Sequence, residues 1–168
     1  MIHLFQAYLE APSAASFSEL RSAVIAHPGY EPYGNALGDL NDQLDGGRFE
    51  EAGANTDINL LLSPRAHLLK SFAWHKCGHE DGERAEQFLY RMMLDGIRGT
   101  GDGSREQPYL VSSVADEHDL LQALGEELDT QRLLEESGRR LDHVVTKSGA
   151  EWYFDVTDVL AKLGRVRS

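Results

Sequence analysis

Apolar residues recur at helical spacing through the first 98 residues, and turn residues separate the runs. Two helices are predicted over residues 2–10 and 16–27, the second opened by a capping box of Ser16 and Glu19. Four more are predicted between residues 36 and 97. The turns between them are expected near Gly47, Pro64 and Gly78. In chain order, the expected apolar faces of the four helices are Leu37, Leu40 and Leu44; Phe49, Ala52, Ile58 and Leu61; Leu68, Leu69, Phe72 and Ala73; and Ala85, Phe88, Leu89, Met92 and Met93.

The run from Gly47 to Ala52, with Pro64 twelve residues beyond Ala52, is typical of the second half of a tetratricopeptide-type hairpin. The pattern partly recurs 33 residues later, where Ala85 takes the place of Ala52. We therefore expect both alanines at close contacts between helices. The usual first-helix signature is missing, and two units are fewer than the roughly three that a self-supporting stack needs. The rest of the chain is expected to cover the open end.

The apolar pattern changes after Gly99-Thr100-Gly101-Asp102-Gly103, which holds three glycines in five residues. Short strands are predicted at 109–111, 131–135, 140–146 and 152–154, with helices at 115–124 and after Asp155. The order predicts an α+β fold, in which a helical-hairpin stack precedes a small, mainly antiparallel sheet with two helices. We expect a helical domain over 1–98 and a small α+β domain over 99–168, packed on the first within one core.

The chain is strongly acidic, since 28 acidic and 16 basic residues leave a net charge of −12. Such a charge argues against nucleic acid and anionic membranes as partners, and it favours a basic protein. The single cysteine, Cys77, excludes an internal disulfide and indicates a reducing compartment. No basic-then-apolar leader opens the chain, and no apolar run approaches about 18 residues. We therefore expect a cytoplasmic protein that has no membrane span.

Two segments could carry metal or phosphate chemistry. His75, Cys77 and His79 are all possible zinc ligands, but no second Cys/His pair follows at ligand spacing. The glycine-rich hinge follows a helix and lacks the lysine of a phosphate loop, and Asp102 stands nearly alone for a calcium loop. We expect a helix end at the first segment and a structural turn at the second. No metal and no other cofactor are predicted.

Several motifs occur in an order that resembles a bacterial family catalogued as domain of unknown function 4919. The resemblance covers residues 17–164, and His118 stands where that family usually has a tyrosine. It implies this architecture and a bacterial origin, but no activity. The motifs are Leu20-Arg21, Tyr30-x-Pro32-Tyr33, Gly47-x-Phe49-x-x-Ala52, Gly101-Asp102-Gly103, Val111 followed by Asp116-Glu117, Gln131, and Tyr153-Phe154-Asp155.

The favoured function is an acidic protein–protein interaction module, and in particular an immunity-type protein that neutralises a basic bacterial toxin. The alternative is a metal- or carboxylate-dependent hydrolytic enzyme that uses the hinge and the sheet carboxylates. A regulatory or small-ligand sensor is a third class. No catalytic residue is assigned. The candidate binding residues are Tyr30, Tyr33, Asp102 and Asp142.

Overall fold

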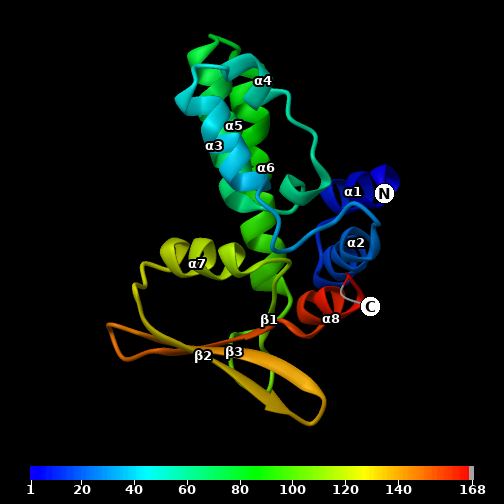
Figure 1. Cartoon of the computed structure of the whole chain (residues 1–168), viewed down its shortest axis with the longest axis vertical. Coiled ribbons are helices and arrows are strands. Elements are labelled where there is room, and N and C mark those ends of the chain that lie inside the picture. Colours follow the sequence, from blue (N-terminus) through cyan, green and yellow to red (C-terminus); the bar gives the residue numbers. More distant parts are fainter. Residues whose placement is uncertain (167–168) are drawn as a thin grey trace.

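The computed structural model describes residues 1–166 and has an α+β architecture, with the helices first and the sheet last (Figure 1). The helical part comprises α1 (Ile2–Glu10), α2 (Ala14–Ala26), α3 (Ala36–Asp45), α4 (Phe49–Gly53), a 3-10 turn η1 (Ile58–Leu60), α5 (Pro64–Lys76) and α6 (Glu80–Gly99). The C-terminal part comprises β1 (Tyr109–Leu110), α7 (Val114–Ala123), β2 (Leu128–Glu136), β3 (Arg139–Thr146), β4 (Glu151–Asp155) and α8 (Thr157–Val166).

The four strands form one sheet in the order β1-β4-β3-β2. The β2–β3 and β3–β4 pairs are antiparallel, and only β1 and β4 run parallel. The prediction of a mainly antiparallel sheet is therefore confirmed. Helix α7 lies over the sheet, between it and the helical stack (Figure 1). Asp142 of β3 stands opposite Leu133 of β2 and Phe154 of β4, and so shares a sheet face with Phe154 of the core.

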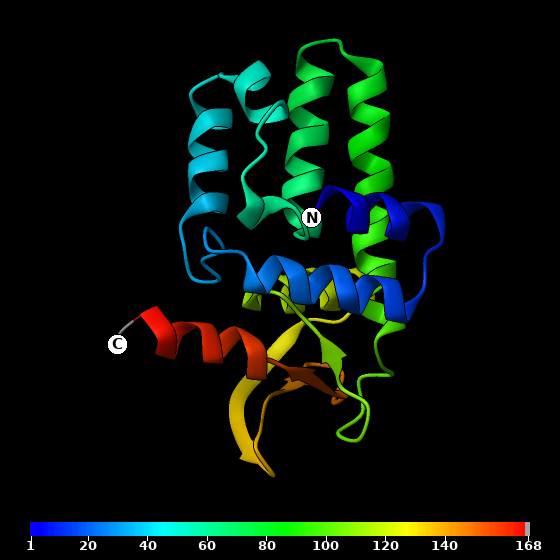
Figure 2. The ribbon, with the colours of Figure 1, turned by 90° about the vertical axis from the view of Figure 1, so that its right-hand side faces the viewer.

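Helices α5 and α6 run antiparallel side by side, with α3 beside them (Figure 2). The turns fall near Gly47, Pro64 and Gly78, as predicted. Gly78 has φ +69°, a left-handed conformation that glycine adopts without strain and that ends α5. All of residues 36–97 are described, and none of them lies in a strand, as expected.

The helix predicted from Phe49 to Leu61 is broken after Gly53. Asn55 accepts a hydrogen bond from the Asp57 backbone N–H (3.0 Å), and Asp57 accepts one from Asn59 (2.9 Å). Such short polar side chains stabilise turns at the expense of helix. The segment therefore forms α4, a loop and the single turn η1.

The predicted capping box at Ser16 was also wrong, because the helix begins three residues earlier. Ser13 is the N-cap of α2, and its hydroxyl accepts a hydrogen bond from the Ser16 backbone N–H. In return, the Ser16 hydroxyl accepts a hydrogen bond from the Ser13 backbone N–H. The box is thus Ser13 with Ser16, since a serine can fill the role that the prediction gave to a glutamate.

The apolar face predicted for α5 was partly wrong, because Leu68 and Phe72 are 50% and 46% exposed. The buried side of α5 is instead partly polar. His67 Nδ1 lies 2.6 Å from Glu86 Oε2 of α6, and Lys70 Nζ lies 2.9 Å from Glu86 Oε1. Polar side chains therefore fill part of the contact between α5 and α6. Because they face inward, Leu68 and Phe72 lie on the exposed side of α5.

The two alanines that the repeat singled out behave differently. Ala52 is completely buried in a small cluster with residues of α3 and α5, as expected. Ala85 is exposed, so the prediction of a close helix contact there was wrong. The reason is that its neighbour Glu86 occupies the inward position of α6. The resemblance to a tetratricopeptide stack therefore remains a prediction.

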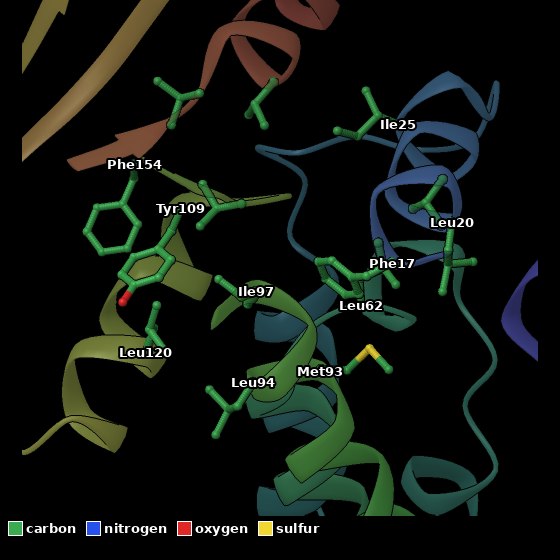
Figure 3. Packing of buried hydrophobic residues seen from close by; sticks show 14 of the residues in the cluster. Phe17, Leu20, Ile25, Leu62, Met93, Leu94, Ile97, Tyr109, Leu120 and Phe154 are labelled. Carbon is green, nitrogen blue, oxygen red and sulfur yellow. The ribbon is translucent and has the colours of Figure 1, made fainter. Parts of the chain in front are cut away.

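A single hydrophobic cluster joins the helical part to the sheet (Figure 3). Phe17 of α2 and Met93 of α6 belong to the same cluster as Phe154 of β4 and Val159 of α8. The expectation that the C-terminal strands and the last helix share one core with the helical part is confirmed. Trp152 packs against this cluster while only partly buried.

Candidate functional site

Buried acidic residues gather on α7, where Asp116, Glu117 and Asp119 follow one another within one turn. Asp116 closes the start of the helix, because Oδ2 accepts hydrogen bonds from the backbone N–H groups of Ser112 (2.8 Å) and Ser113 (2.9 Å). Burial nevertheless raises the pKa of Asp116 to about 7, against the lowering effect of those bonds. Its role is that of a helix cap.

Glu117 points from α7 to the sheet and meets Asp142 of β3. The side-chain nitrogen of Gln131, on β2, donates to Glu117 Oε2 (3.1 Å) and to Asp142 Oδ2 (3.0 Å). The two carboxyl groups therefore lie against the same amide, and they are only 1% and 8% exposed. Neither forms an ion pair with another side chain of residues 1–163, the part of the chain whose side chains are described.

Burial, followed by the charge of Asp142 and a hydrogen bond to it, raises the pKa of Glu117 to about 10. Glu117 is thus a neutral acid at neutral pH. The only Glu117 atom without a conventional partner is Oε1, which is the oxygen left to carry the proton. We call Glu117 and Asp142 the proton-sharing pair, because the proton that Glu117 keeps removes the repulsion between two buried like charges.

Asp119 points the other way, to the start of α5. It accepts hydrogen bonds from the backbone N–H of Arg65 (3.1 Å) and from Arg65 Nε (2.8 Å). Burial raises the pKa of Asp119 and outweighs the opposing effect of the Arg65 charge. Helix α7 therefore binds the stack through Asp119 and the sheet through Glu117.

The two tyrosines predicted as binding residues, Tyr30 and Tyr33, differ in how far they are exposed. Tyr33 is 51% exposed, and burial together with the charges of Asp142 and Glu117 raises the pKa of its hydroxyl. Tyr30 is buried, and its hydroxyl donates to the Ser112 carbonyl oxygen (2.6 Å) just before α7. Tyr33 is therefore close to the carboxyl pair, whereas Tyr30 holds the α2–α3 link against α7.

Asp102 lies apart from the other candidates, in the turn before β1. It accepts a hydrogen bond from the Ser104 backbone N–H (2.9 Å), and hydrogen bonds from Ser104 lower its pKa. Gly103 beside it has φ +76°, and a Cβ there would lie 2.6 Å from the rings of Trp152 and Tyr109. The hinge is the structural turn that the sequence predicted.

The four candidate binding residues thus do not form one site. Asp142 belongs to the carboxyl pair, and burial together with the charges of that pair raises the pKa of Tyr33; Tyr30 lies beside the start of α7, and Asp102 is elsewhere. Sequence reasoning missed Glu117 as the second carboxyl group of the pair and Gln131 as the amide that binds both. Their only signal was their presence in the motifs of the family resemblance.

The possible zinc ligands have ordinary roles at the α5–α6 turn. His79 Nδ1 accepts a hydrogen bond from the Gly82 backbone N–H (2.9 Å) and so caps α6. His75 Nδ1 lies 3.1 Å from Glu83 Oε2, and Cys77 is exposed. Among residues 1–166, no group of three His, Cys, Asp or Glu side chains could hold a metal ion.

A second candidate site is a run of exposed carboxylates on the outer part of the stack, which we name the acidic layer. Residues 36–63 hold six acidic residues and one basic residue, Arg48, a net charge of −5. By contrast, α5, α6 and their turn (64–99) hold five acidic and six basic residues. Helix α3 forms one edge of the stack, with α4 at its far end (Figure 2). The members of the acidic layer, all exposed, are Asp39, Asp42, Asp45, Glu50, Glu51 and Asp57.

Comparison with known proteins found no family model, no curated protein and no solved structure that matches this chain. The family resemblance therefore remains a prediction from the motifs. None of the helices within residues 1–166 is both long enough and apolar enough to cross a membrane.

Proposed function

We propose that this protein is an acidic interaction module that captures a basic partner protein through the acidic layer. Within that class, an immunity-type protein that neutralises a basic bacterial toxin fits best, acting in the cytoplasm. The observation that carries the proposal is the exposure of all six carboxylates of the layer, in a segment (36–63) that holds a single basic residue.

The carboxylates of the layer are largely uncompensated. Arg48 Nε lies 3.2 Å from Glu51 Oε2. Within residues 1–163, whose side chains the structure describes, Asp42, Asp45 and Glu50 form no ion pair. Neighbouring like charges raise the local negative potential, which accelerates the encounter with a cationic surface and repels acidic competitors. Salt screens this effect beyond about 10 Å at 0.1 M ionic strength.

The test uses the product of the adjacent gene as the first candidate partner, with association rates measured at several salt concentrations. A triple variant, Asp42→Asn, Asp45→Asn and Glu50→Gln, removes the unpaired charges of the layer. The matched control, Glu10→Gln, Glu19→Gln and Glu106→Gln, removes three exposed charges outside it.

We expect the partner to be basic and the association rate to fall by about tenfold or more from low to high salt. The layer variant should slow association strongly, and the control much less. Equal effects of the two variants, or a tight partner with no excess of basic residues, would overturn the proposal.

A hydrolytic enzyme is the second candidate, and the proton-sharing pair is the observation that favours it. A Glu117 that keeps its proton at neutral pH, next to the carboxyl group of Asp142, could donate a proton to a substrate. However, both groups are almost completely buried, and Asp102 of the hinge does not join them. Chromogenic ester, phosphoester and glycoside substrates test this candidate. Turnover that is lost in Glu117→Gln would establish it.

A further inference from the structure

Helix α5 exposes two large apolar side chains one turn apart, Leu68 at 50% and Phe72 at 46%. The ring of Phe72 meets the ring of Phe49 edge-on, with centroids 6.2 Å apart. Lys76 Nζ lies 5.1 Å from the centre of the Phe72 ring. We name Phe49, Leu68 and Phe72 the apolar stripe.

In this stripe Leu68 and Phe72 of α5 are exposed and Phe49 of α4 is half-buried, although α5 buries polar groups. His67 and Ser71, the residues just before Leu68 and Phe72, are 3% and 5% exposed. Burying apolar surface is favourable, so covering the exposed side chains of the stripe with a partner would stabilise the complex. Exposed apolar surface rimmed by polar groups is typical of a protein-binding surface.

The stripe borders the acidic layer directly. Phe49 begins α4, and the exposed Glu50 and Glu51 follow it. A complementary partner must therefore present apolar side chains and positive charges next to one another. Because Leu68 and Phe72 are four residues apart on a helix, they match the spacing of apolar residues along a second helix.

We propose that the apolar stripe anchors a basic amphipathic helix of the partner, whose cations face the acidic layer. This inference rests on the proposed function and names the recognition element of the partner. A second copy of this chain is a poorer occupant, because a self-paired surface would bring two acidic layers together.

The probe is a fluorescent 18-residue helical peptide of leucine and lysine, and its control carries glutamate in place of lysine. Binding to the full-length protein is followed by fluorescence anisotropy. The test variant is Leu68→Ser with Phe72→Ser. Phe88 of α6 is 44% exposed, so Phe88→Ser is a control of the same residue type and similar exposure. Circular dichroism checks that each variant keeps its helix content.

We expect the lysine peptide to bind and the glutamate peptide not to bind. The double variant should weaken binding by about tenfold or more, and Phe88→Ser by less than about twofold. If the triple variant of the acidic layer lost peptide binding while the double variant (Leu68→Ser with Phe72→Ser) kept it, this inference would be overturned and the proposed function would stand. The inference would also be overturned if the lysine peptide did not bind, or if both peptides bound equally. A dimer of this chain that the double variant abolished would overturn it as well. A natural basic partner that still binds the layer would keep the proposed function intact.

Discussion

Folding raises the pKa of Glu117, a change that the sequence does not predict. An acid with an ordinary pKa near 4.5 becomes one that keeps its proton to about pH 10, because it is buried against Asp142. The sign of the effect on stability follows. Below pH 4.5 the residue is protonated in both states, and above it only the unfolded state loses the proton. The free energy of unfolding therefore falls as the pH rises from about 4.5 to about 10.

Glu117→Gln should remove this dependence, because an amide is neutral at every pH and can still hydrogen-bond Asp142. Asp116 has a pKa of about 7 and contributes a slope of the same sign, so the clean comparison lies between pH 7 and 9. There the wild type should lose up to about 1.4 kcal/mol per pH unit relative to the variant. Urea unfolding at each pH measures the difference. Parallel pH profiles for the two proteins would show that Glu117 titrates normally.

At the scale of elements, helix packing depends on one glycine of α6. A Cβ at Gly96 would overlap the ring of Phe17 from α2 and lie 2.7 Å from Tyr8 Oη of α1. At Gly99, the last residue of the same helix, the nearest atom would be 3.9 Å away. The close approach of α1, α2 and α6 thus requires the missing side chain at position 96.

Gly96→Ala should destabilise the protein by about 1–3 kcal/mol, because overpacking outweighs the gain in helix propensity. Gly99→Ala should be neutral or stabilising by up to about 1 kcal/mol. Thermal unfolding of both variants measures the contrast. A Gly96→Ala protein at least as stable as Gly99→Ala would mean that α2 can shift without cost.

Element types were more predictable than helix faces. Gly78 and the strand alternation of 140–146 were local signals, and the structure follows them closely. The exposure of Leu68 and Phe72 was not predictable, since the pairing of His67 with Glu86 joins residues of two different helices. The site had the same limitation. Asp142 was identified as a candidate, but its neighbour Glu117 comes from α7, and their meeting depends on how α7 crosses the sheet.

At the scale of the whole molecule, both parts of the chain contribute to the larger of two hydrophobic clusters. Phe154 and Val159 pack in the cluster that includes Phe17 and Met93. The helical part therefore has an apolar surface that only the C-terminal part covers. Neither part should reach its native packing alone.

A fragment that ends at Gly99 should form a molten or aggregating species, with helical far-UV dichroism but weak near-UV signal and strong dye binding. The full chain should unfold in one transition, because the core is shared. Gel filtration and thermal scans of the fragment check this expectation. A monomeric fragment with a sharp transition at the full chain's midpoint would show that the stack closes on itself.

The position of α7 has a consequence for how such a chain can evolve. The glycine-rich segment after α6 looks like a natural crossover point, where one C-terminal half could be exchanged for another by recombination. Yet Asp119 beyond it is buried against Arg65 before it. A chimera that brought in an uncharged residue at position 65 would keep the buried Asp119 but lose the Arg65 side chain that pairs with it, and would be destabilised for that reason. We therefore expect recombination at the hinge to be selected against, and residues 65 and 119 to change together among relatives of this chain.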